Sequence, residues 1–188
     1  MERLQSFGRV RNIDEENRRV TVVASTSDVA RDGMIIEANG WDLRHYDANP
    51  VVLWAHNDRE LPVARTVAST VEDGALIQTH EFADHMVASD VFRSIVGGFV
   101  NATSVRWLPG ETEVRKMPDG SRVLVFTKGH QLLETSYVPI PADPGALIVR
   151  TDGSDFDVRA YFPPEPAPAG PTIAQRFLAG FMRHKAEV

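Results

Sequence analysis

The chain has 188 residues, of which 43% are hydrophobic, and a formal net charge of −6 at pH 7. These values predict one domain with a packed core and a tail, and the negative charge argues against general nucleic-acid binding. The absence of cysteine excludes disulfides, thiolate metal sites and cysteine nucleophiles. No apolar run approaches the length of a membrane span and the first residues lack an apolar signal region, so we expect a cytoplasmic protein without a membrane segment.

Residues 1–150 are predicted to form the globular domain. Runs of β-branched and aromatic residues, bounded by turn-forming residues, predict strands at 19–26, 51–56, 75–82, 101–107, 122–128 and 132–139. The helical spacing of Val87, Val91 and Ile95 predicts a helix over 83–98. Short strands separated by turn signals favour a mainly β fold with a few helices, an α+β domain built on an antiparallel β-barrel.

The composition changes after the predicted domain. Residues 151–171 become rich in proline and lack hydrophobic periodicity, which predicts a flexible linker. Residues 172–188 return to a helical period, with Ile173, Phe177 and Phe181 in one stripe. An isolated amphipathic helix of this length is marginal in water, so we expect it to pack on a partner protein, on its own domain or on a second copy.

Three short segments each place one reactive side chain in an apolar run. They are NPVVLWAHN with His56, GGFVNATSVRW with Ser104, and LLETSYVPIPADPGALI with Glu134. A buried histidine, serine and carboxylate are costly unless they pair with one another. Their pairing would make a serine nucleophile activated by a base. The chain has no GxSxG motif, so spacing alone does not establish that chemistry.

In this order and at these distances, the three segments resemble the prohead (capsid maturation) serine proteases of tailed bacteriophages, which are related to the assemblin proteases of herpesviruses. The likeness covers about residues 20–148 and includes DVARDGMIIEANGWDL at 28–43. The closing VPIPADPGA resembles the end of the family pattern, with Asp143 where asparagine is common. The family often has Ser-Val-Gly-Phe at the nucleophile, whereas this chain has Arg106 and Trp107 after Val105.

The resemblance implies the herpesvirus protease fold for residues 1–150 and a catalytic role for each of the three side chains. Ser104 would be the nucleophile, His56 the base and then the acid, and Glu134 the group that orients His56. His130 is the rival for the third place, because the herpesvirus relatives use a second histidine there. No metal and no organic cofactor is implied.

The activity implied is that of an endopeptidase that cleaves capsid and scaffold proteins during prohead maturation and processes itself. The expected partners are the major capsid protein and the scaffold protein, and a homo-oligomer is left open. The enzyme would act in the host cytoplasm, inside the assembling prohead. The predicted tail helix would then dock on scaffold or capsid protein.

Other interpretations of the same residues remain. The chain could be a non-catalytic assembly or scaffolding module with the same fold, although an intact His56 and Ser104 argue against it. Ser136 is a rival nucleophile that we interpret as a packing residue. Arg106 could help to hold an oxyanion or could read acidic substrate residues in a groove. A metal-dependent hydrolase is a further interpretation, which rests only on a cluster of possible ligands. The two histidines of this cluster are five residues apart and do not align on one helix face. The cluster comprises His80, Glu81, Asp84 and His85.

Overall fold

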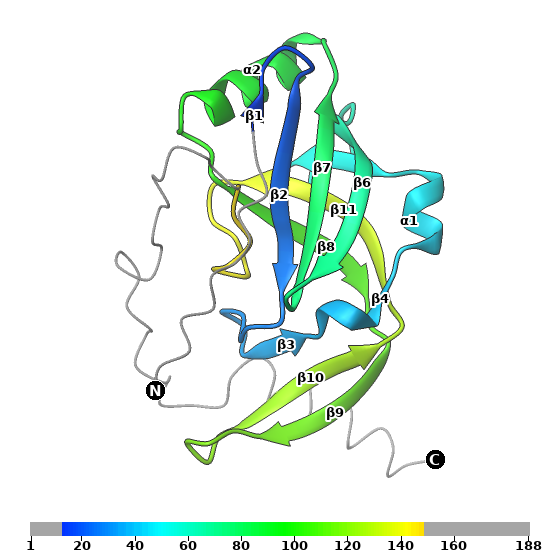
Figure 1. Ribbon diagram of the computed structural model, residues 1–188, viewed down its shortest axis with the longest axis vertical. Coiled ribbons are helices and arrows are strands. Elements are labelled where there is room, and N and C mark those ends of the chain that lie inside the picture. Colours follow the sequence, from blue (N-terminus) through cyan, green and yellow to red (C-terminus); the bar gives the residue numbers. More distant parts are fainter. Residues whose placement is uncertain (1–12, 149–188) are drawn as a thin grey trace.

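The computed structural model describes residues 13–148, which form two β-sheets with helices beside them (Figure 1). The predicted linker at 151–171 and the predicted C-terminal helix at 172–188 lie outside these residues. The predicted class, mainly β with a few helices, is confirmed, and the larger sheet curls into a half-barrel.

The larger sheet has eight strands, and one of them, β11, pairs with three others. β4 and β5 pair with β11 in parallel, whereas β8 pairs with it antiparallel. The order is β1 (Ile13–Asp14), β2 (Arg19–Thr26), β7 (Ala75–Phe82), β6 (Ala64–Glu72), β5 (Val51–Trp54), β11 (His130–Val138) and β4 (Trp41–Asp42), with β8 (Ala102–Leu108) on β11.

The smaller sheet packs below the larger one in Figure 1 and has three strands. They are β3 (Met34–Ile36), β10 (Arg122–Lys128) and β9 (Glu111–Lys116). The helices in the described part of the chain are a 3₁₀ turn, η1 (Ala38–Gly40), and two α-helices, α1 (Arg44–Ala48) and α2 (Met86–Val96).

A short segment at residues 146–148 links β2 to β8, which are not paired with each other in the sheet. On one side, Val23 of β2 donates its N–H to the Leu147 carbonyl at 2.8 Å. On the other side, Thr103 of β8 donates to the Ala146 carbonyl, and Ile148 donates to the Asn101 carbonyl, both at 2.9 Å. This double attachment fixes the start of β8, the strand that carries Ser104.

The main core fills the inside of the curl and extends to α2. The helix buries Ala88, Val91, Phe92 and Ile95. The predicted stripe is therefore wrong at Val87, which is exposed, because the buried face is centred one position further along. The sheet contributes the rest of this core, in which fully buried members include Val20, Val22, Val52, Leu76 and Tyr137.

The six predicted strands are all present, three of them with the predicted bounds and three with shifted ends, and most strand pairs in residues 13–148 are antiparallel as expected. The predicted helix is also present as α2. The prediction missed β6, which lies inside the sheet but is largely exposed and polar, so its sequence lacks an apolar alternation. It also missed β9, which is mostly exposed and charged, and elements of two to five residues that no periodicity can reveal.

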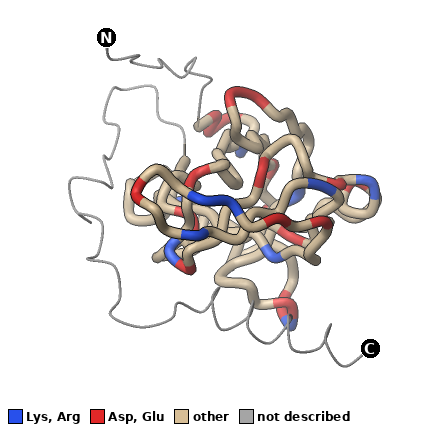
Figure 2. The backbone as a smooth tube through the Cα atoms, turned by 90° about the horizontal axis from the view of Figure 1, so that it is seen from below, with Lys and Arg blue, Asp and Glu red and all other residues tan. Residues whose placement is uncertain are grey.

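The predicted Asp73-Gly74 turn joins β6 to β7. Its two residues have φ values of 48° and 77°, which is the left-handed conformation that a two-residue hairpin turn requires. In the described residues, no helix is both long enough and apolar enough to cross a membrane. Acidic and basic positions are interspersed over the face seen in Figure 2.

Candidate active site

Glu134 lies in β11 just after a bulge in the pairing of that strand with β8. Leu132 pairs with Trp107 and Glu134 with Arg106, so Leu133 is an extra residue between the two pairs. One extra residue reverses the face to which the following side chains point. Leu132 therefore lies in the core, and Glu134 lies on the opposite face, beside Arg106.

The sequence predicted His56 as the last residue of a strand at 51–56, but β5 ends two residues earlier and His56 lies in the turn that follows it. The strand ends at Trp54, and Ala55 and His56 have φ values of 51° and 60°. Non-glycine residues in this left-handed region cost roughly 1–3 kcal/mol each, and the surroundings must hold them there. The resulting turn carries the His56 ring to Glu134 on β11.

The His56 ring and the Glu134 carboxylate are hydrogen-bonded, with 2.6 Å between Nδ1 and Oε1. The Glu134 side chain is 5% exposed, whereas that of His56 is 32% exposed. Because an ionised carboxylate can only accept, Nδ1 carries the proton of the neutral ring and Nε2 keeps its lone pair. Nε2 is then available to take a proton from a hydroxyl group.

Ser104 lies on β8 directly opposite Ser136 of β11. Directly opposite residues of an antiparallel pair project from the same face, with Cα atoms about 4.5–5.5 Å apart. Ser104 is 8% exposed, and its hydroxyl has no hydrogen-bond partner within residues 13–148. The structure thus brings Ser104 to the face that carries Glu134, although no hydrogen bond joins it to His56.

Ser136, the rival nucleophile, is fully buried and its hydroxyl is already engaged. It donates to Glu134 Oε2 at 2.6 Å and accepts from the backbone N–H of His56 at 3.0 Å. Because the only hydroxyl proton of Ser136 is donated to the carboxylate, Ser136 differs from Ser104, whose hydroxyl has no partner among residues 13–148. From the sequence we interpret Ser136 as a packing residue, but its position two residues after Glu134, on the same strand face, is a signal for this contact.

The side chain of Arg106 is directed to the turn that carries His56. Nη2 donates to the His56 backbone carbonyl at 2.9 Å, and Nη1 donates to Asp58 at 3.0 Å. Nε is 4.0 Å from Glu134 Oε1. These contacts assign the guanidinium to the His56 turn, a role that neither of the two sequence interpretations of Arg106 contained.

His130, the other candidate for the third position, lies on the far side of the bulge. Its Nε2–H donates to the Glu37 carbonyl at 2.9 Å, and its ring packs edge-on against Trp41 with centroids 4.6 Å apart. Burial lowers the pKa of His130. The structure brings Glu134 and not His130 to His56, because the bulge removes the shared face that four-residue spacing would give in a regular strand.

Asp143, which stands where the resembling family often has asparagine, fastens the segment after β11 to β2. Its carboxylate accepts from the backbone N–H and the hydroxyl of Thr26, at 2.5 and 2.9 Å, and from the Gly145 N–H at 2.8 Å. Burial raises the pKa of Asp143. Its contacts are therefore those of a structural acceptor near the start of the 146–148 segment.

The residues of the alternative metal site have separate partners. Glu81 forms ion pairs of 2.6 Å with one arginine of β2 and one of β6. His85 accepts from the Ala88 N–H and so caps the start of α2. His80 is buried in the core. Across residues 13–148, no three such side chains converge as metal ligands would.

His80 is held in its neutral form by two neutral partners. Its Nε2–H donates to the Gln78 side-chain oxygen at 3.2 Å, so Nδ1 accepts from the Tyr137 hydroxyl at 3.0 Å. Burial lowers the pKa of His80 from 6.5 to about 3. Between these two pH values the unfolded chain binds a proton that the folded chain does not, so the free energy of unfolding decreases as the pH falls.

We therefore expect His80→Gln to flatten the dependence of unfolding free energy on pH between about pH 6.5 and 5, where few carboxyl groups titrate. The buried histidine contributes a slope of up to about 1.4 kcal/mol per pH unit in this window. Urea unfolding at several pH values measures that slope. His45→Gln, which changes an exposed histidine on α1, is the matched control, and an unchanged slope in His80→Gln would exclude this role.

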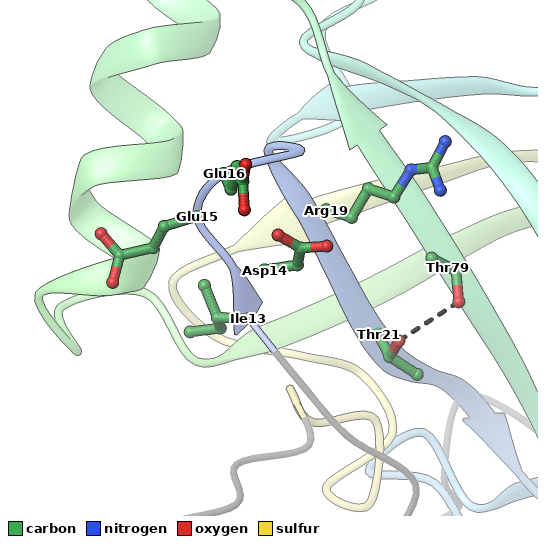
Figure 3. Close-up of a pocket in the computed structure, with 7 residues that line it drawn as sticks. All are labelled: Ile13, Asp14, Glu15, Glu16, Arg19, Thr21 and Thr79. Atoms are coloured by element: carbon green, nitrogen blue, oxygen red, sulfur yellow. Dashed lines mark hydrogen bonds between the residues drawn. The ribbon is translucent and has the colours of Figure 1, made fainter.

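An open pocket of about 500 Å³ lies away from this site, between β1, β2 and β7 (Figure 3). Three carboxylates and one arginine border it, and the hydroxyls of Thr21 and Thr79 are 3.2 Å apart at its side. None of its lining residues belongs to β5, β8 or β11, the strands that position His56, Ser104 and Glu134. The pocket therefore contributes no residue to the candidate active site.

Comparison with protein-family profiles, with curated proteins and with solved structures finds no match for this chain. The geometry around His56 and the sequence resemblance are therefore the two grounds for proposing a function.

Proposed function

We propose that the chain is a serine endopeptidase that cleaves capsid and scaffold proteins during the maturation of a phage prohead. The observation that carries this proposal is the 2.6 Å hydrogen bond between His56 Nδ1 and Glu134 Oε1, on the strand face that Ser104 shares. A histidine oriented by a carboxylate, with a serine on the strand face of that carboxylate, is the arrangement from which base-activated nucleophiles are built.

In the proposed mechanism, Ser104 Oγ attacks the carbonyl carbon of the scissile peptide while His56 Nε2 takes the hydroxyl proton. Glu134 stabilises the imidazolium through the Nδ1–H hydrogen bond and fixes the tautomer. His56 then gives the proton to the leaving amine, and an acyl-enzyme remains on Ser104. Water, deprotonated by the same Nε2, releases the second product. In such sites the serine–histidine hydrogen bond often tightens only when substrate binds.

The wider proposal follows from the sequence resemblance. The fold would be that of the herpesvirus proteases, which use a curled antiparallel barrel, and the major capsid and scaffold proteins would be the partners and substrates. The enzyme would act in the host cytoplasm, inside the assembling prohead, and would also process itself. No metal or organic cofactor has a place in this mechanism.

The second candidate is a non-catalytic assembly module with the same fold. The burial of Ser104 favours it, since a residue that is 8% exposed is not yet open to a peptide. The Ser104 hydroxyl has no hydrogen-bond partner within residues 13–148, which favours the protease, because a purely structural buried hydroxyl normally has a partner.

Co-expression with the capsid protein of the same virus distinguishes the two candidates. We expect the capsid protein to be shortened with the wild-type chain and to stay intact with Ser104→Ala, as measured by mass spectrometry of purified particles. Ser94→Ala, which changes a serine of α2 whose hydroxyl donates to the Asp90 carbonyl, is the matched control and should cleave normally. Equal processing by wild type and Ser104→Ala would contradict the protease.

A further inference from the structure

The backbone on both sides of His56 is held by side chains from the two neighbouring strands. Its N–H donates to Ser136 Oγ on β11 at 3.0 Å, and its carbonyl accepts from Arg106 Nη2 on β8 at 2.9 Å. The residue so held has a left-handed φ of 60°, as does Ala55 before it. A strained turn of this kind persists only where its surroundings over-determine it.

We propose that Ser136 and Arg106 are positioning residues that clamp His56 in this conformation and so aim its ring at Glu134. This inference deepens the proposed function and rests on it, because it assigns to two further residues the geometry of the proposed base. The clamp is defined by three hydrogen bonds, which join Ser136 to Glu134, Ser136 to the His56 N–H, and Arg106 to the His56 carbonyl.

Ser136 connects the two halves of the acid–base pair. Its hydroxyl donates to Glu134 Oε2 and accepts from the His56 N–H, so one buried atom fixes the carboxylate and the backbone at once. Its fully buried position leaves no water to replace either bond. The geometry therefore makes Ser136 a support for the base and not a second nucleophile.

Arg106 supplies the other side of the clamp. The guanidinium presents several donors in a fixed plane, and here two of them bind the His56 carbonyl and Asp58. Asp58 is two residues after His56, so the arginine spans the turn. Glycine, which the resembling family often has at this position, has no side chain for this contact, and the clamp is thus a feature of this chain's own sequence.

The proton on His56 Nδ1 reports on the clamp without any assay of activity. We expect wild-type protein to show a low-field NMR signal from this proton, assigned by its loss in His56→Ala. In Ser136→Ala and in Arg106→Gln the signal should broaden or disappear, because the ring leaves Glu134 part of the time and the proton exchanges with water. Ser94→Ala should keep it. Ser136→Thr, which retains the hydroxyl, should restore it relative to Ser136→Ala.

Kinetics on a cleaved capsid peptide give the second readout. Each clamp variant should lower kcat by about 10²-fold, the cost of misplacing a catalytic group, with little change in KM. A loss in Ser136→Ala as large as in Ser104→Ala would overturn the proposal, since Ser136 would then be the nucleophile. A wild-type NMR signal in both Ser136→Ala and Arg106→Gln would also overturn it.

The two readouts separate failure of the clamp from failure of the proposed function. If wild-type protein cleaves no capsid peptide but the NMR signal is lost as expected in both variants, the clamp stands and the protease does not. Because the Arg106 side chain is 44% exposed, Arg106→Gln should fold even if Ser136→Ala does not, so the test remains decisive.

Discussion

Replacing either Ser104 or His56 with alanine is expected to lower kcat by about 10⁶-fold while leaving the domain folded. The Ser104 side chain has no hydrogen bond to lose within residues 13–148. His56→Ala removes one bond to the buried Glu134, which keeps its bond to Ser136, so the larger loss of stability is expected in His56→Ala. The effect on rate is large because attack needs both the hydroxyl and the base that takes its proton. Removing either one removes the same step.

The double variant provides the sharpest form of this prediction. Because the two residues act as a unit, Ser104→Ala with His56→Ala should be no slower than either single variant. Cleavage of a capsid peptide, with urea unfolding as the test of folding, measures both quantities. Ser94→Ala and His45→Ala are the matched controls. Losses that multiply in the double variant would mean that the two residues act independently.

Replacing Glu134 with glutamine is expected to lower kcat by about 10⁴-fold, a smaller loss than for the nucleophile or base. The amide can present a donor to Nδ1, which favours the tautomer with the proton on Nε2 and removes the base. Glutamine is close in size to glutamate, so the fold should be retained. The comparison with Ser104→Ala, in the same peptide assay, therefore reports the orienting role alone.

His130→Asn is the matched test of the rival third residue. We expect it to lower stability, because it opens space beside Trp41 in a buried cluster, and to keep near-normal kcat in the folded fraction. Peptide cleavage corrected for the folded fraction measures this. A fully active Glu134→Gln together with an inactive, folded His130→Asn would move the third catalytic role to His130.

The parts of the fold that the sequence predicted are those with strong local signals. The strand at 75–82 and the Asp73-Gly74 turn each follow from neighbouring residues, and both are present as predicted. Which strands become neighbours is not a local property. β5 and β11 pair in parallel although about 80 residues separate them, as in the pairing of Leu53 with Ser136. No periodicity within either segment contains that information.

The candidate site shows the same division. The chain order of His56, Ser104 and Glu134 was visible in the sequence, but their geometry depends on two irregularities. One is the bulge at Leu133, which moves His130 to the other face of β11, and the other is the left-handed turn at His56. Both depart from regular strand geometry and both depend on contacts with other strands, so alternation along one strand could not predict them.

The central claim, that Ser104 is a nucleophile activated by His56, is tested most directly by labelling purified protein with a fluorophosphonate and mapping the adduct by peptide mass spectrometry. A fluorophosphonate forms a stable bond only with an activated hydroxyl, with loss of fluoride, and it needs no knowledge of the natural substrate. We expect the adduct on Ser104 in wild-type protein and in Ser94→Ala, and no adduct in His56→Ala. An adduct on Ser136, or a wild-type protein left unlabelled at Ser104, would contradict the claim.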